Sequence, residues 1–97
     1  MDEAVLRSVA EQLMGDLSVE VAGEAVPIRK TSRHRLRTAR FETDGREYEA
    51  IEQNAEKPSR WGKLAREGHK VVQFRDVESG KYVAVAVDGK VRVYGKK

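Results

Sequence analysis

Arginine is the residue type with the clearest potential for binding chemistry in this sequence, and it is concentrated in one segment. Arg33, Arg35 and Arg37 occupy alternate positions, the spacing that projects side chains to one side of an extended strand. A guanidinium group is planar and donates two hydrogen bonds at once, so it matches a phosphate group well. Lys30 and Arg40 flank the three arginines. We therefore predict that these five residues bind nucleic acid or another polyanion.

Two aromatic residues could add base stacking to such a site, namely Tyr48 and Trp61. The chain contains neither the aromatic-rich signature of an RRM domain nor the GXXG loop of a KH domain. The competing interpretation is that the arginines pair with acidic residues of the same chain. The partners would be Glu47, Glu49, Glu52 and the acidic amino-terminal segment. Charged runs are usually solvated faces of a protein.

Charge is distributed unevenly along the chain, and this supports an alternative function. Residues 1–28 contain Arg7 and six acidic residues, whereas residues 29–46 contain seven basic residues and two acidic ones. Segments of opposite charge could associate between chains as easily as within one chain. Pro27 cannot donate a ladder hydrogen bond, so its strand would lie at an open sheet edge. The alternative is a protein-interaction module or a homo-oligomer with no ligand of its own.

Residues that usually carry catalysis or bind metal ions form no recognisable pattern. His34 and His69 are 35 positions apart, and neither belongs to an HxH or HExxH arrangement. The acids between residues 44 and 52 lack the following acid-x-lysine element that a metal-dependent nuclease would need. No serine lies in a GxSxG sequence, and no glycine-rich phosphate loop is present. We therefore expect no enzyme activity, no metal site and no cofactor.

Length and composition indicate a single small globular domain spanning residues 1–97. Hydrophobic residues make up 39% of the chain and charged residues 36%, which predicts one modest core under a strongly charged surface. The absence of cysteine excludes disulfides and favours a reducing compartment. No apolar run approaches the roughly 20 residues that span a bilayer. We expect a cytoplasmic protein without membrane contact.

Hydrophobic periodicity predicts the elements of the amino-terminal half. Val5, Val9 and Leu13 recur at i, i+4, which indicates an amphipathic helix over residues 2–15 that buries this stripe in the core. From residue 18 the period changes to two, which predicts a first hairpin over residues 18–28.

The Asp44-Gly45 dipeptide predicts a second hairpin, because a type I′ turn needs positive φ at both of its central positions. The turn sets the cross-strand partners. These are Thr43 with Arg46, Glu42 with Glu47, Phe41 with Tyr48, Arg40 with Glu49, Ala39 with Ala50, and Thr38 with Ile51.

The carboxyl-terminal half predicts a second short helix and a three-stranded meander. The helix spans residues 54–68, ends at Gly68 and buries Trp61 against the sheet. The strands cover residues 71–74, 82–87 and 91–94, with turns at Ser79-Gly80 and Asp88-Gly89. With Glu78 opposite Lys81, Phe74 faces Val85 and Val72 faces Val87.

These elements together predict an α+β fold. An amino-terminal helix is followed by antiparallel hairpins, a second short helix and a three-stranded antiparallel meander. The pattern gives about seven strands. It leaves open whether they form one curved sheet, two sheets or a partly open barrel.

Overall fold

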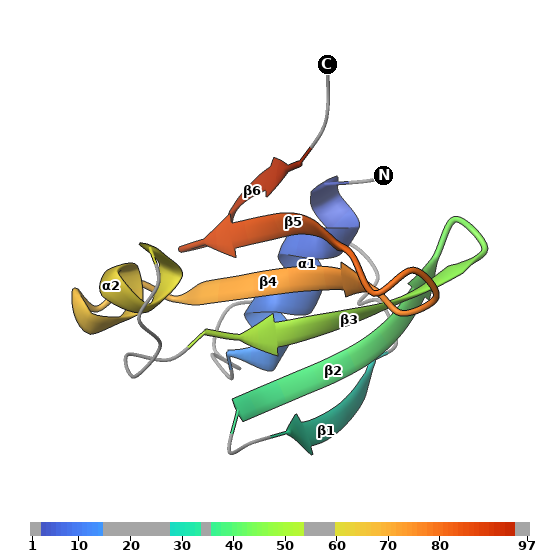
Figure 1. Cartoon of the computed structure of the whole chain (residues 1–97), viewed down its shortest axis with the longest axis horizontal. Coiled ribbons are helices and arrows are strands. Elements are labelled where there is room, and N and C mark those ends of the chain that lie inside the picture. Colours follow the sequence, from blue (N-terminus) through green and yellow to red (C-terminus); the bar gives the residue numbers. More distant parts are fainter. Residues whose placement is uncertain (1–2, 15–27, 34–35, 54–59, 95–97) are drawn as a thin grey trace.

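The computed structural model describes residues 3–14, 28–33, 36–53 and 60–94 (Figure 1). The helices are α1 (Glu3–Leu13) and α2 (Arg60–Arg66). The strands are β1 (Arg29–Arg33), β2 (Leu36–Thr43), β3 (Arg46–Glu52), β4 (Val71–Asp76), β5 (Tyr82–Val87) and β6 (Lys90–Val93). The six strands form one open antiparallel sheet in the order β1-β2-β3-β4-β5-β6. The α+β class is therefore confirmed.

The strand count differs from the predicted seven. Within the described part of the chain there are six strands. One of them, β1, covers residues for which the sequence predicts no strand of their own. All of the predicted first hairpin except Ile28 lies outside the described residues. The sheet is open rather than closed into a barrel, because β1 and β6 lie at opposite edges (Figure 1).

Helix α1 packs across one face of the sheet, as its hydrophobic stripe predicted. Leu6, Val9 and Leu13 are almost completely buried against the sheet. The sheet side of this core consists of Ala39, Phe41, Tyr48, Ala50, Val72, Phe74, Ala84 and Ala86. The alanines leave room for the helix to lie close to the strands, while the aromatic rings fill the remaining volume. Phe41 lies 5.8 Å from Tyr48 and 6.0 Å from Phe74, measured between ring centroids.

The β2–β3 hairpin has the predicted turn and register. Asp44 and Gly45 have φ values of 54° and 73°, so both adopt the left-handed conformation that a type I′ turn requires. All six predicted cross-strand pairs occur, including the unfavourable pair of Glu42 with Glu47. Since side chains alternate along a strand, this register fixes which residues of β2 and β3 face α1.

The predicted register between β4 and β5 is wrong by one residue. Phe74 lies opposite Ala84 and Val72 opposite Ala86, with an irregularity between Phe74 and Arg75. The connection is longer than the predicted two-residue turn. Oδ1 of Asp76 accepts hydrogen bonds from the backbone N–H groups of residues 78 and 79, at 2.9 and 3.3 Å. The backbone carbonyl of Asp76 accepts another from the N–H of residue 80 at 2.8 Å.

Helix α2 begins at Arg60 in the described part of the chain, and residues 54–59 lie outside it. The helix ends as predicted, because Gly68 has a φ of 95°. Its N–H donates to the Ala65 carbonyl, and the next N–H donates to the Leu64 carbonyl, each at 3.1 Å, the arrangement of a Schellman motif. Trp61, which was predicted to be buried against the sheet, is less buried than the core residues. Trp61 is half-buried and does not belong to the core under α1.

Candidate nucleic-acid interface

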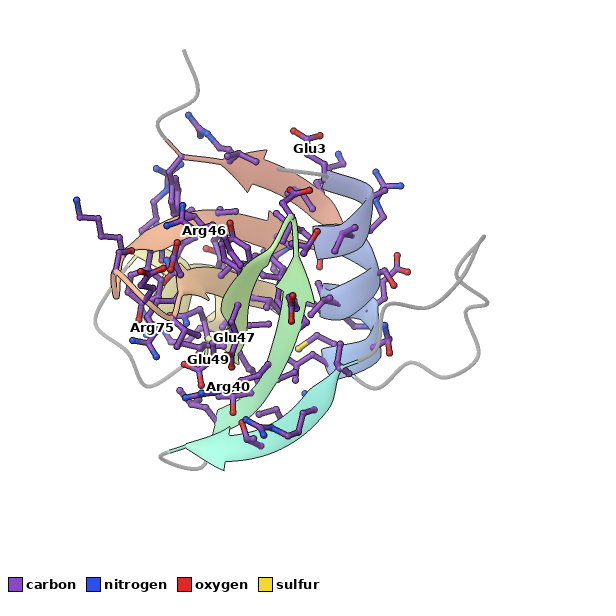
Figure 2. All side chains as sticks on the ribbon, turned by 90° about the vertical axis from the view of Figure 1, so that its right-hand side faces the viewer. Glu3, Arg40, Arg46, Glu47, Glu49 and Arg75 are labelled. Atoms are coloured by element: carbon purple, nitrogen blue, oxygen red, sulfur yellow. The ribbon has the colours of Figure 1, made fainter. Side chains whose placement is uncertain are left out.

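Arg40, Glu49 and Arg75 form a row across β2, β3 and β4 on the sheet face turned away from α1. The strand pairings place Glu49 opposite both arginines, and Figure 2 shows these side chains together on that side. Nη2 of Arg75 lies 2.8 Å from Oε1 of Glu49, whose side chain is only 5% exposed. Arg40 lies 3.9 Å from Glu49 and 3.3 Å from Glu47. Charge at the centre of this face is therefore largely compensated within the sheet.

Arg37 makes more hydrogen bonds to a carboxylate than Arg40 does. Its Nη2 and Nε donate to the two carboxylate oxygens of Glu52 at 3.0 and 3.1 Å, and its backbone N–H donates to the same carboxylate at 3.0 Å. The hydrogen bond from Arg37 lowers the pKa of Glu52 below its usual range. The same hydrogen bond raises the pKa of Arg37 further. Arg37 is thus a structural partner of Glu52, as the self-pairing interpretation predicted.

Two expectations about the predicted site are wrong. Arg33 and Arg37 do not share a strand, because β1 ends at Arg33 and the antiparallel strand β2 starts at Leu36. Tyr48 is 5% exposed and stacks on Phe41 beneath α1, so its ring is not available to a base. Of the remaining predicted residues, the side chains of Lys30 and Arg33 and the whole of Arg35 lie outside the described part of the structure.

A second group of cations, which the sequence interpretation did not identify, lies on α2 and β6. The two elements read RWGKLAR and KVRV and contain no acidic residue. Their basic residues are Arg60, Lys63, Arg66, Lys90 and Arg92. Figures 1 and 2 show α2 at one end of the sheet, on the side away from α1. The sequence shows that each of these two segments is basic and contains no acidic residue. More than twenty residues separate them, so the sequence alone does not group them.

Aromatic rings accompany this second group of cations. The guanidinium carbon of Arg60 lies 5.3 Å from the ring centroid of Trp61, within the range of a cation–π contact. The Tyr94 hydroxyl lies 3.5 Å from Nε2 of Gln73. Burial raises the pKa of Tyr94, while the hydrogen bond from Gln73 and the charges of Arg92 and Arg60 oppose that rise. Both arginines therefore lie close enough to act on the Tyr94 hydroxyl. We call Arg60, Trp61, Arg92 and Tyr94 the basic-aromatic cluster.

The histidines form no larger cluster in the described residues. Nδ1 of His69 lies 2.6 Å from Oδ2 of Asp88, and the backbone N–H of Lys70 donates to the other oxygen at 2.9 Å. These contacts lower the pKa of Asp88, with the backbone hydrogen bond as the largest cause. No group of three histidine, aspartate or glutamate side chains suited to a metal ion occurs among residues 3–14, 28–33, 36–53 and 60–94. His34 lies outside those ranges.

Neither α1 nor α2, the helices in the described part of the chain, is long and apolar enough to cross a membrane.

Comparisons with known proteins assign no relative. No protein-family model matches the chain, and neither a curated protein nor a solved structure matches it.

Proposed function

We propose that this domain binds single-stranded nucleic acid through the sheet face turned away from α1, with the basic-aromatic cluster at the centre of the site. The observation that carries this proposal is that Arg92 on β6 and Arg60 on α2, two elements without acidic residues, both influence the Tyr94 hydroxyl. Arg60 also stacks on Trp61. Guanidinium groups bind phosphates, and aromatic rings stack on bases regardless of sequence. A polyanion without bases would use the cations alone.

Arg40 can extend this site across the sheet, whereas Arg37 cannot. Arg40 is 36% exposed and its partner Glu47 is 49% exposed, at a separation of 3.3 Å. An exposed pair of this kind contributes about 0–1 kcal/mol, so a phosphate can replace Glu47 at little cost. Arg37 would have to give up a bidentate contact to Glu52, whose side chain is 19% exposed. The predicted binding residues thus divide into an exchangeable arginine and a structural one.

Lys30, Arg33 and Arg35 remain part of the proposal as further phosphate-binding residues. Residues 29–35 contain no acidic residue, and β1, which includes Lys30 and Arg33, is an edge strand of the described sheet. A nucleic-acid backbone that crosses from the basic-aromatic cluster over Arg40 would reach this edge. The predicted arginine-rich segment is then the far end of the site rather than its centre.

Fluorescence anisotropy with a labelled single-stranded oligonucleotide tests the proposal, with polyphosphate as a competitor that has no bases. Arg60→Gln and Arg92→Gln are expected to weaken binding and to reduce the salt dependence by about one counterion each. Tyr94→Ala is expected to cost about 1–3 kcal/mol of oligonucleotide binding and to leave polyphosphate binding nearly unchanged. Arg7→Gln on α1 is the matched control. Absence of binding at low salt, or equal losses in the control and the cluster variants, overturns the proposal.

The alternative function is a protein-interaction module or self-association. The position of β1 at the sheet edge supports it, because an edge strand presents unused backbone groups to a further strand. Sedimentation analysis across a range of salt concentrations separates the two functions. A monomer mass that stays constant across the salt range contradicts self-association. That result does not bear on the proposed oligonucleotide binding.

A further inference from the structure

A pocket of about 250 Å³ lies between the carboxyl-terminal half of α1 and the sheet. Its apolar lining comes from Ala10, Met14 and Val72. Three charged residues also line it: Glu11 from α1, Lys70 just before β4, and Asp88 from the β5–β6 turn. None of these residues takes part in the proposed nucleic-acid site, so the pocket would serve a ligand of its own.

The walls of the pocket are held together by hydrogen bonds between distant parts of the chain. Nε of Arg7 on α1 donates to the Gly89 carbonyl at 3.2 Å. Asp88 and Lys70 exchange two hydrogen bonds: the Lys70 N–H donates to Oδ1 of Asp88, and the Asp88 N–H donates to the Lys70 carbonyl, each at 2.9 Å. His69 holds the other carboxylate oxygen of Asp88. These contacts preorganise the pocket, and a preorganised site loses little entropy when it binds a ligand.

We propose that this pocket binds a free α-amino acid with an aliphatic side chain. Its volume lies below the roughly 300–1,000 Å³ of pockets for drug-sized ligands, so the ligand must be small. Glu11 and Asp88 supply carboxylates for the α-ammonium group. The Lys70 ammonium has three donor hydrogens and can therefore contact a carboxylate in addition to its contacts within the protein. The aliphatic side chain would lie on the apolar lining residues.

The charges discriminate between this ligand and its singly charged analogues. An amine without a carboxylate cannot accept a hydrogen bond from the Lys70 ammonium, and a carboxylate without an amine meets Glu11 and Asp88 as like charges. Both analogues therefore bind more weakly than the zwitterion. Each lost charged contact is expected to weaken binding about tenfold or more.

Amide NMR titration of the full chain with L-leucine, 3-methylbutylamine and 4-methylpentanoate tests the inference. L-leucine is expected to shift amides around residues 10–14, 70–72 and 88–89 saturably, and each analogue is expected to bind at least about tenfold more weakly than leucine. Glu11→Gln and Lys70→Gln should each weaken leucine binding, whereas the matched controls Glu3→Gln and Lys81→Gln should not. Circular dichroism checks that every variant is folded.

Three results overturn the inference: no saturable leucine shifts, binding of the amine as tightly as leucine, or leucine shifts that survive both pocket substitutions. Because the pocket and the basic-aromatic cluster share no residue, each result is independent of the oligonucleotide experiment.

Discussion

Replacement of Arg75 by methionine provides a strong test of how the sheet is stabilised. Arg75 contacts the buried carboxylate of Glu49 at 2.8 Å, and its own side chain is 20% exposed. Its Nε is buried and has no hydrogen-bond partner within the described structure. Methionine keeps most of the unbranched stem and removes the guanidinium group. The substitution therefore tests the ion pair with little change in packing.

The size of the effect follows from the burial of the two partners. An exposed ion pair contributes about 0–1 kcal/mol, and loss of one partner from a fully buried pair costs about 3–5 kcal/mol. Glu49 is buried and Arg75 is partly exposed, so we expect Arg75→Met to lower the free energy of unfolding by about 2–4 kcal/mol. Domains of this size are stable by about 5–15 kcal/mol. The melting temperature should therefore fall by about 10 °C or more.

Urea and thermal unfolding followed by circular dichroism measure this change. Arg40→Met is the matched control, because Arg40 is 36% exposed and lies 3.9 Å from the same carboxylate; its expected cost is about 0–1 kcal/mol. The double variant Glu49→Leu/Arg75→Met removes both charges and should recover most of the lost stability. A cost below about 1 kcal/mol for Arg75→Met, or a double variant no more stable than the single one, refutes the reasoning.

Three further substitutions test the core and the two carboxylates with lowered pKa values. Phe74→Ala removes a completely buried ring and should cost about 3–5 kcal/mol in urea unfolding. Arg37 lowers the pKa of Glu52 in the folded chain, so the pair stabilises the fold above the ordinary carboxyl range and loses this effect as pH falls through the folded pKa. The stability difference between the native chain and Glu52→Gln should therefore shrink on acidification. Asp88 also has a lowered pKa, and asparagine tolerates its positive φ, so Asp88→Asn should reduce the loss of stability in acid measured by thermal unfolding.

Sequence reasoning succeeded where one local signal determines the geometry. Asp44-Gly45 specifies a two-residue turn, and the turn alone sets the partners of every residue in the β2–β3 hairpin. The side chains agree with that register. Phe41 lies directly opposite Tyr48, and Arg40 lies directly opposite Glu49. The hydrophobic stripe of α1 was equally decisive, because apolar residues that recur with a period of 3.6 form one continuous face only on a helix.

The β4–β5 register failed because a side chain, rather than the turn residues, determines the loop. Ser79-Gly80 suggested a two-residue turn, but the Asp76 carboxylate captures the N–H groups that follow it and lengthens the connection. A slip of one residue exchanges the two faces of a strand. Ala84 and Ala86 consequently lie beneath α1, and Val85 lies on the other face.

The arginine-rich strand was predicted as one element because nothing in the sequence marks its interruption. Residues 34 and 35 are histidine and arginine, and neither is among the glycine, proline, asparagine or aspartate residues that signal a turn. The pairing of Arg33 with Leu36 nevertheless separates β1 from β2. The alternate spacing of these arginines would place them on one side of a single strand. The fold has no strand that contains both Arg33 and Arg37.

Charge density along the sequence is a poor guide to available cations in an antiparallel sheet, because hairpin pairing places each strand against its neighbour in sequence. The basic strand β2 lies beside β3, which supplies Glu47, Glu49 and Glu52 to Arg40 and Arg37. By contrast, α2 and β6 have no acidic residue of their own, and β5, the hairpin partner of β6, reads YVAVAV and supplies none. The cations on those elements are therefore better placed to meet a ligand, although the arginine-rich segment is more prominent in the sequence. That contrast is why the proposed binding centre lies on Arg60 and Arg92.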